Sequence, residues 1–170
     1  MTFTHPRIDY FPIPASVNVT IKESFGRIYI PETNPPRKYA RARSCCVKVA
    51  GYTCPGHCGT DISARVGTII RAPWTGKVEL VKGDSHFGWT ASVVRKGTDI
   101  EMFFAHCGYF YAGIDGHTVA AGEPIAKVGT TGQTSGGHSH AETREVAGNW
   151  CSARPNYKPL VASQYRMRNA

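Results

Sequence analysis

Two short histidine-containing patterns stand out because they combine residue types that bind metal ions. The first is H-x-G-x-D, which runs from His57 to Asp61, and the second is H-x-H, which joins His138 and His140. Side chains along a strand alternate between its two faces, so the two ends of each pattern can share a face. Two such segments laid side by side would bring imidazoles and a carboxylate to one point, as in a catalytic zinc site with one position open for water.

The two patterns differ in how specific they are. Seven histidines in 170 residues give about 0.3 chance occurrences of H-x-H, whereas H-x-G-x-D arises by chance only about 0.02 times. A lone histidine is more often a packed or solvated residue than a ligand, and we place His5, His86 and His117 in that class. Found together, the two patterns predict a metal site.

The segments around these patterns predict strands. From residue 57 onwards, short runs of β-type residues recur between glycine turns, and some of them alternate apolar and polar residues. These runs are 68–72, 77–81, 91–95, 100–104, 124–128 and 138–143. No helical period and no internal repeat is visible. The pattern therefore predicts an all-β domain, either a sandwich or a barrel.

The length of 170 residues suits one domain. We predict a single domain over 1–170 with three parts. Residues 1–56 form a loop-rich N-terminal extension with a long basic loop, because this stretch holds many prolines, and five Lys or Arg residues without an acid fall within 37–48. Residues 57–146 form the core, and residues 147–170 form a C-terminal tail.

The net charge of +8 favours an anionic partner, which would be nucleic acid, a membrane surface or an acidic polymer such as cell wall. No nucleic-acid recognition motif is visible, so we expect no nucleic-acid partner. No apolar stretch has the length of a transmembrane helix, so we expect no integral membrane association. The first 20 residues lack a basic start followed by an apolar run, and we therefore expect no signal peptide.

The cysteines are expected to lie outside the metal site. His57 and Cys58 are neighbours, so on a strand they point to opposite faces, and the same argument turns Cys107 away from His106. We predict that Cys58 and Cys107 lie behind the site as small buried residues. Disulfides among the other cysteines stay open: Cys45, Cys46, Cys54 and Cys151.

Longer matches around the two patterns bring a family into view. The segment 121–142, AGEPIAKVGTTGQTSGGHSHAE, closely resembles the signature of the M23 peptidases, the lysostaphin-like family. Upstream, HCGTDI at 57–62 and APWTGKV at 72–78 resemble the first metal motif of the family and the strand turn after it. FAH at 104–106 is similar to the Tyr-Ala-His block, and SFGR at 24–27 is similar to the start of the domain.

The resemblance covers roughly residues 24–146, with three departures from the family pattern. The stretch between Gly26 and His57 is longer than expected, Gly137 stands where proline is frequent, and Phe104 stands where tyrosine is usual. None of these departures removes a metal ligand. The long loop bears on substrate preference and leaves the chemistry intact. The fold implied is an antiparallel β-sandwich or barrel-sandwich hybrid of the lysostaphin-like type.

The resemblance implies that His57, Asp61 and His140 bind one Zn²⁺ per chain. Two neutral imidazoles and one carboxylate leave such a site with a net charge of about +1, and the ion lowers the pKa of its bound water to about 7. His106 and His138 would then sit beside the open position. We expect His138 to act as the base and His106 to stabilise the oxyanion or assist the proton transfer, although the two roles could be exchanged.

Glu142 follows the H-x-H pair at period two, so it either orients a ligand histidine from behind or pairs with a nearby cation.

The resulting hypothesis is a zinc-dependent endopeptidase that cuts the peptide cross-links of bacterial peptidoglycan. The basic, compact chain without a signal peptide suggests a phage lysis enzyme, an endolysin. Such an enzyme would act as a monomer on a Gram-negative-type wall, at a D-Ala–diaminopimelate cross-link. It would reside in the host bacterial cytoplasm until lysis and then act on the periplasmic wall. The alternatives are a virion-borne tail lysin, a non-catalytic M23-like domain that binds wall or activates a partner, and, on charge alone, a nucleic-acid-binding protein.

Overall fold

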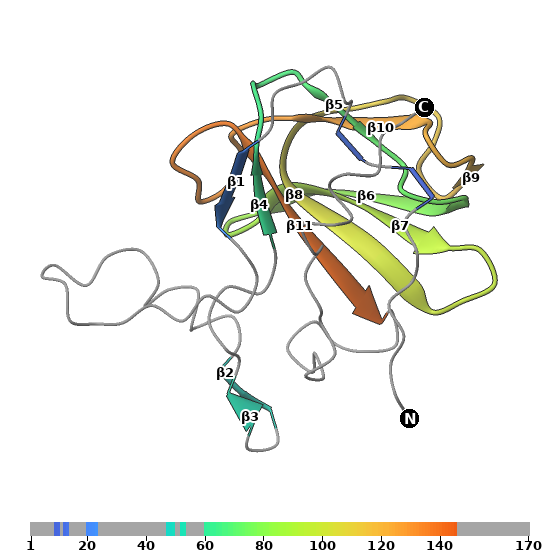
Figure 1. The fold of residues 1–170 in the computed structure, drawn as a ribbon, viewed down its shortest axis with the longest axis horizontal. Coiled ribbons are helices and arrows are strands. Elements are labelled where there is room, and N and C mark those ends of the chain that lie inside the picture. Colours follow the sequence, from blue (N-terminus) through green and yellow to red (C-terminus); the bar gives the residue numbers. More distant parts are fainter. Residues whose placement is uncertain are drawn as a thin grey trace, which may run out of the picture.

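The computed structural model describes residues 9–10, 12–13, 20–23, 47–49, 52–53 and 60–145 (Figure 1). These residues form strands and turns, and no helix is found among them. The first strands are β1 (Thr20–Glu23), β2 (Val47–Val49), β3 (Tyr52–Thr53), β4 (Thr60–Ser63) and β5 (Ile69–Arg71). They are followed by β6 (Gly76–Asp84), β7 (Gly88–Arg95), β8 (Ile100–Phe110), β9 (Thr118–Val119), β10 (Pro124–Val128) and β11 (His138–Glu145).

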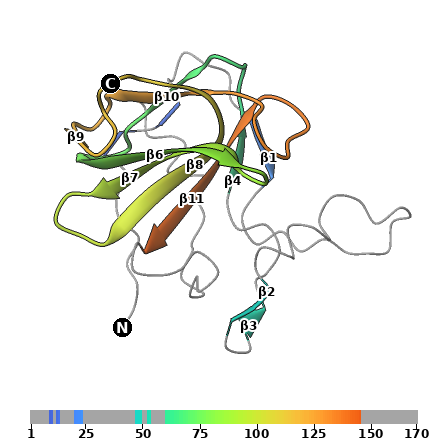
Figure 2. The same cartoon turned by 180° about the vertical axis from the view of Figure 1, so that it is seen from behind.

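One antiparallel sheet connects all of these strands except β2 and β3, which pair with each other. Its order is β1-β4-β11-β8-β7-β6-β9, and β10 joins it by pairing with β8 and β5 (Figures 1 and 2). The expectation of an all-β antiparallel domain is confirmed. Each of the six predicted runs coincides with a strand: β6, β7, β8 and β11 extend beyond the predicted ends, and β5 is one residue shorter at each end.

The long strand β8 links the two halves of the sheet. Its first part, Ile100 to Ala105, pairs with β11, and its last part, Cys107 to Phe110, pairs with β10. The change of partner falls at His106, between these two parts. β8 therefore carries any side chain at residue 106 to the place where the two pairings meet.

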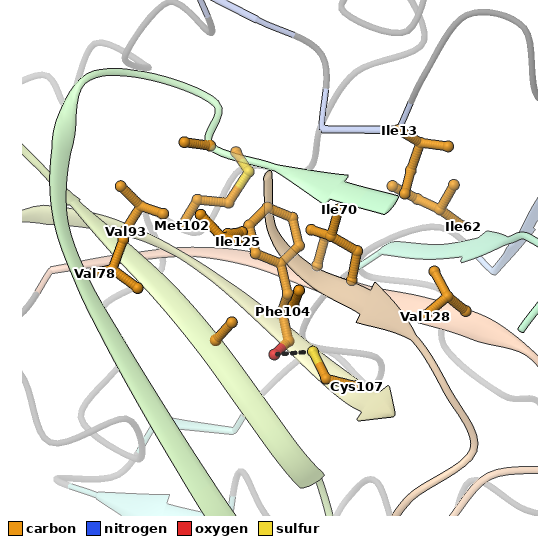
Figure 3. Close-up of a cluster of buried hydrophobic side chains, with 14 of the residues drawn as sticks. Ile13, Ile62, Ile70, Val78, Val93, Met102, Phe104, Cys107, Ile125 and Val128 are labelled. Atoms are coloured by element: carbon orange, nitrogen blue, oxygen red, sulfur yellow. Dashed lines mark hydrogen bonds between the residues drawn. The ribbon is translucent and has the colours of Figure 1, made fainter. Parts of the chain in front are cut away.

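A cluster of buried hydrophobic side chains forms the core, and it includes Val78, Met102 and Ile125 (Figure 3). Met102, Phe104 and Cys107 of β8 are buried there, against residues of β5, β6, β7 and β10. Trp74, in the turn before β6, is fully buried, and its indole Nε1 donates a hydrogen bond to the carbonyl oxygen of Val93 at 3.0 Å. This hydrogen bond satisfies the one polar atom that a buried indole brings into a core.

The predicted division of the chain at residues 56 and 146 stays a prediction. The described sheet lies mostly within 60–145, and most residues of the predicted extension and tail lie outside the described residues. Within the part that the structure describes, no helix has the length and apolar character needed to cross a membrane.

Two valines on β6 test how much of the stability comes from this core. The side chain of Val78 is fully buried, whereas Val81 is 45% exposed. We expect Val78→Ala to lower the free energy of unfolding by about 2–3 kcal/mol, because two buried methyl groups are lost and a small cavity remains. The control Val81→Ala should change it by less than about 0.5 kcal/mol. Urea unfolding measures both, and equal effects would contradict this assignment of the core.

Candidate functional site

The pairing of β4 with β11 places Asp61 directly opposite His140. Cross-strand partners share a face of the sheet, and His140 Nδ1 lies 2.8 Å from Asp61 Oδ1. On its other side, His140 Nε2 lies 2.7 Å from Glu142 Oε1. His140 and Glu142 are buried. The imidazole is therefore held at both nitrogens between two carboxylates.

His138 lies two residues earlier on β11 and faces the same carboxylate. Its Nε2 is 3.7 Å from Asp61 Oδ1, and its Nδ1 is 2.9 Å from the carbonyl oxygen of Gly136. Since a carbonyl oxygen only accepts hydrogen bonds, Nδ1 carries the proton in the neutral ring. The Thr134 hydroxyl is 3.0 Å from the same nitrogen and donates to the Gly136 carbonyl. The Nε2 lone pair of His138 thus points to the Asp61 side.

His106 reaches the site through a bulge in β8. Its φ of 61° lies in the left-handed region, and it is the one non-glycine residue with positive φ among the described residues. Opposite it on β7, Trp89 pairs with Cys107 and Ala91 pairs with Phe104, so one residue of β7 faces two of β8. The extra residue reverses the alternation of side chains after Ala105.

The consequence of the bulge is visible in the burial pattern. Met102 and Phe104 face the core, so strict alternation would also send residue 106 into the core and residue 107 to the site. Instead Cys107 belongs to the core cluster, and the His106 ring lies beside His138, with ring centroids 4.7 Å apart. The His106 and His140 centroids are 6.3 Å apart.

His106 is held as a neutral imidazole. Its Nδ1 is 2.9 Å from the carbonyl oxygen of Thr131, so this nitrogen carries the proton and Nε2 has a free lone pair. Burial lowers the pKa of His106, and the hydrogen bond to Thr131 raises it by less. The resulting pKa is about 4. At neutral pH the ring is therefore uncharged and accepts a proton through Nε2.

Aromatic side chains line the site on the side of β7 and β8. The Phe87 ring lies 5.7 Å from the His140 ring and 5.2 Å from the Phe103 ring, measured between centroids. The His86 ring packs edge-on against Phe87, and its Nδ1 is 3.2 Å from Gln133 Oε1. An apolar wall of this kind lowers the local dielectric constant and strengthens the electrostatic interactions of the neighbouring carboxylates.

The structure brings together five of the residues singled out in the sequence: Asp61, His106, His138, His140 and Glu142. His57 and Cys58 lie outside the described residues, as do the four cysteines for which disulfides were left open. The burial of Cys107 is confirmed, and its thiol is free. Glu142 contacts His140, which is the arrangement in which it orients a ligand histidine.

Two groups at the site were not found from the sequence. Thr131 and Thr134 bind the two flanking histidines, but nothing in their residue type marks them. His86 was set aside as an unrelated histidine, and it lies against the aromatic wall beside Phe87. The bulge at His106 was also not predicted, because residues other than glycine seldom adopt a left-handed conformation.

The donor set suits zinc. With Nε2–H of His140 donated to Glu142, the Nδ1 lone pair faces Asp61 Oδ1, and a nitrogen and a carboxylate oxygen so placed are typical zinc ligands. Two ligand atoms on one tetrahedral zinc ion lie about 3.3 Å apart, so the 2.8 Å separation needs only a small opening. Among the described residues no three His, Cys, Asp or Glu side chains form a metal-binding group. The third predicted ligand, His57, is outside them.

Comparison with known proteins gives a consistent result. The sequence profile of Peptidase family M23 matches residues 55–153. The DD-carboxypeptidase/endopeptidase Mpg of Neisseria meningitidis is 34% identical over 88 residues, which are 52% of this chain and 20% of that protein. The matched segment thus spans about a fifth of the length of this relative.

Solved structures share the fold. A zinc-containing peptidase from Vibrio cholerae superposes with a TM-score of 0.59 at 21% identity, over 83% of this chain and 37% of that one. The catalytic domain of the prophage-encoded M23 protein EnpA from Enterococcus faecalis gives 0.51 at 26% identity, over 66% and 82%. The expected lysostaphin-like fold is confirmed.

The two carboxylates around His140 should make the free energy of unfolding of the metal-free protein depend on pH. Burial alone would lower the pKa of His140, but the hydrogen bonds and charges of Asp61 and Glu142 outweigh it and raise this pKa to about 9. The imidazolium therefore stabilises the fold fully below about pH 6.5, and this contribution is lost as the pH rises to about 9.

We expect the free energy of unfolding of the metal-free protein to fall by on the order of 2–3 kcal/mol between pH 6.5 and 9.5. Glu142→Gln should weaken this dependence, since one of the two carboxylates is gone. The exposed Glu79→Gln on β6 should leave it unchanged. Urea unfolding with a chelator measures all three proteins. The same pH dependence in Glu142→Gln and wild type would contradict the assigned contact.

Proposed function

Because this chain belongs to peptidase family M23, we propose that it is a zinc-dependent endopeptidase which hydrolyses the peptide cross-links of bacterial peptidoglycan. One observation carries the proposal. A carboxylate and three imidazoles from β4, β8 and β11 converge on one face of the sheet, and Nδ1 of two of these imidazoles contacts a backbone carbonyl, which in the neutral rings leaves the lone pair on Nε2. Metal-assisted hydrolysis of an amide requires such groups, namely ligands for a metal ion and bases for proton transfer.

The residues that would hold zinc are Asp61, His140 and, by its motif, His57. When bound, the ion supplies Lewis-acid polarisation of the scissile carbonyl and acidifies a water molecule. Glu142 would fix the ring of His140 by accepting a hydrogen bond from its Nε2–H, so that the Nδ1 lone pair would face the metal.

Proton transfer falls to the two flanking histidines. His138 Nε2 lies on the side of Asp61 and is placed to take a proton from the attacking water and to deliver it to the leaving amine. His106 also presents a lone pair at Nε2, because its Nδ1 proton is donated to the Thr131 carbonyl. A neutral His106 in this tautomer accepts a proton and does not donate from Nε2. Its geometry therefore favours assistance in proton transfer over stabilisation of the oxyanion.

The substrate class is proposed from the family and from a relative. The matched relative is named a DD-carboxypeptidase/endopeptidase, and a DD bond joins two residues of D configuration. Such bonds occur in the D-Ala–diaminopimelate cross-links of Gram-negative-type peptidoglycan. The net charge of +8 suits this anionic polymer. We therefore propose this cross-link as the bond cleaved, and we propose that the protein acts as a monomer.

A role in phage lysis is a further part of the proposal. The catalytic domain of a prophage-encoded M23 protein is 26% identical to this chain over most of that domain. An endolysin would be made in the host cytoplasm and would reach the periplasmic wall at lysis. Clearing of outer-membrane-permeabilised cells from outside, together with release of phage only when the protein is intact, tests this role. Presence of the protein in purified virions would instead identify a tail lysin.

Zinc content tests the ligand set directly. We expect the purified wild type to hold one Zn²⁺ per chain, and His140→Ala and Asp61→Ala to lose most of it, because two remaining ligands bind zinc weakly. Cys107→Ala is the matched control, since this thiol is buried on the core face and should not contribute. Atomic emission spectrometry after dialysis measures the metal. Loss of zinc in Cys107→Ala with retention in His140→Ala would overturn the ligand set.

Release of new amines from purified peptidoglycan tests the activity. We expect wild type with zinc to release them and His140→Ala to be reduced by at least about 1,000-fold, because both the metal and the oriented ring are lost. His117→Ala is the control, because His117 is exposed in the turn before β9 and its ring nitrogen Nδ1 contacts the carbonyl of Asp115, away from the site.

Mass spectrometry of the products identifies the bond. If zinc-loaded wild type releases no amine, the enzyme proposal fails, and a non-catalytic domain that binds the wall or activates a partner takes its place.

A further inference from the structure

Thr131 ties three segments of chain together directly behind His106. Its hydroxyl donates to the carbonyl oxygen of Cys107 at 2.7 Å and accepts a hydrogen bond from the backbone N–H of Trp89 at 2.8 Å. Its own carbonyl oxygen accepts the Nδ1 proton of His106 at 2.9 Å. Side chain and backbone of one residue therefore fix both the strand that carries His106 and the ring itself.

The backbone of His106 depends on the same surroundings. A left-handed conformation at a non-glycine residue costs about 1 kcal/mol or more and persists only where neighbouring contacts impose it. The N–H of His106 donates to the carbonyl of Phe87 at 2.9 Å, and its carbonyl accepts from the N–H of Gly129 at 2.9 Å. Phe87 lies in the loop before β7, close to Trp89, to which Thr131 is hydrogen-bonded. Gly129 lies in the loop after β10, which also contains Thr131.

These two loops meet without free space. A Cβ atom added to Gly88 would lie 2.4 Å from the Thr131 hydroxyl oxygen, and one added to Gly132 would lie 2.4 Å from the Gly88 nitrogen. Contacts this close leave Thr131 little freedom to move. Its carbonyl is therefore a fixed acceptor for His106.

We infer that Thr131 is a positioning residue, whose hydroxyl holds its own carbonyl in place so that His106 keeps the tautomer with a proton-accepting Nε2 at the site. The inference rests on the proposed function for the meaning of that lone pair. Its structural part, the fixed tautomer, is independent of activity. His138 is held by a different carbonyl, that of Gly136, with the Thr134 hydroxyl beside it. A change at Thr131 should therefore act on His106 and leave His138 unaffected.

The test compares two substitutions at one position. Thr131→Val keeps the shape but removes the hydroxyl, and Thr131→Ser keeps the hydroxyl but removes the methyl group. Thr98→Val is the matched control, because the Thr98 hydroxyl likewise donates to a carbonyl, that of Arg95, and accepts an N–H, that of Ile100, in an exposed turn away from the site. Long-range ¹H–¹⁵N NMR reports the tautomer of each ring, and amine release from peptidoglycan gives kcat and KM.

We expect wild-type His106 to show the single tautomer protonated at Nδ1. In Thr131→Val this signal should become a mixture of tautomers, and kcat should fall roughly 10- to 100-fold with little change in KM, as for other residues that orient a functional group from behind. Thr131→Ser should restore both readouts, and Thr98→Val should change neither. An unaltered His106 tautomer in Thr131→Val, or an equal loss in Thr131→Ser, would overturn the inference.

A second pair of variants covers the case in which Thr131→Val does not fold. Gly88 and Gly97 both have positive φ, 69° and 76°, so both alanine substitutions pay the same backbone strain. Only an alanine at Gly88 collides with Thr131, because nothing lies within 4 Å of a Cβ at Gly97. Gly88→Ala should therefore disturb the His106 tautomer and Gly97→Ala should not. Equal tautomer signals in the two variants would overturn the inference.

The tautomer and the activity separate the two proposals. If wild type releases no amine while Thr131→Val still alters the His106 tautomer, the positioning role stands and the enzyme proposal fails. If wild type is active but Thr131→Val keeps its tautomer and its kcat, the enzyme proposal stands and the role of Thr131 fails.

Discussion

The register between β4, β11 and β8 is the constraint on which the site depends. His140 pairs with Asp61 on one side and with Ala105 on the other, so the central strand carries its imidazole between the two neighbours. A slip of one residue would turn the histidines and Glu142 into the core and bring Ser139 and Ala141 to the surface. Such a slip would bury these polar side chains against apolar residues such as Ile62 and Phe104, which costs free energy and therefore opposes it. The packing of the core thus fixes the geometry of the polar face.

Within this register, the site is built from two kinds of polar contact. Carboxylates hold the nitrogens of His140, whereas backbone carbonyls hold the Nδ1 atoms of His106 and His138. A carboxylate beside an imidazole favours its charged form, whereas burial, which the carbonyl contact offsets only in part, keeps the His106 ring neutral. In the proposed mechanism the same residue type would therefore serve as a metal ligand in one place and as a proton acceptor in two others. One buried hydroxyl, that of Ser139, has no partner among the described residues, and we have no physical account of it.

The bulge at His106 allows β8 to contribute both to the core and to the site. β8 needs its apolar residues on the core side up to Phe104 and again at Cys107, which leaves no regular position from which a side chain at 106 could face the site. One residue in a left-handed conformation reverses the alternation and resolves the conflict. The energetic cost is local, and it is offset by the hydrogen bonds that His106 donates to the carbonyls of Phe87 and Thr131 and accepts from the N–H of Gly129. Strain of this kind is frequently found at functional sites.

The sequence by itself determined the class of fold, the strands around the site, and the residues Asp61, His138, His140 and Glu142, because period-two spacing on a strand fixes which side chains share a face. The family resemblance added His106, which alternation alone would have placed in the core. Only the tertiary structure decided that His106 turns out through a bulge, that Thr131 and Gly136 set the two tautomers, and that Glu142 contacts His140. The bulge and the contact of His106 with Thr131 depend on segments far apart in the chain, which local patterns do not encode. The contacts of His138 with Gly136 and of His140 with Glu142 are local, but the spacing of the residues does not specify these side-chain orientations.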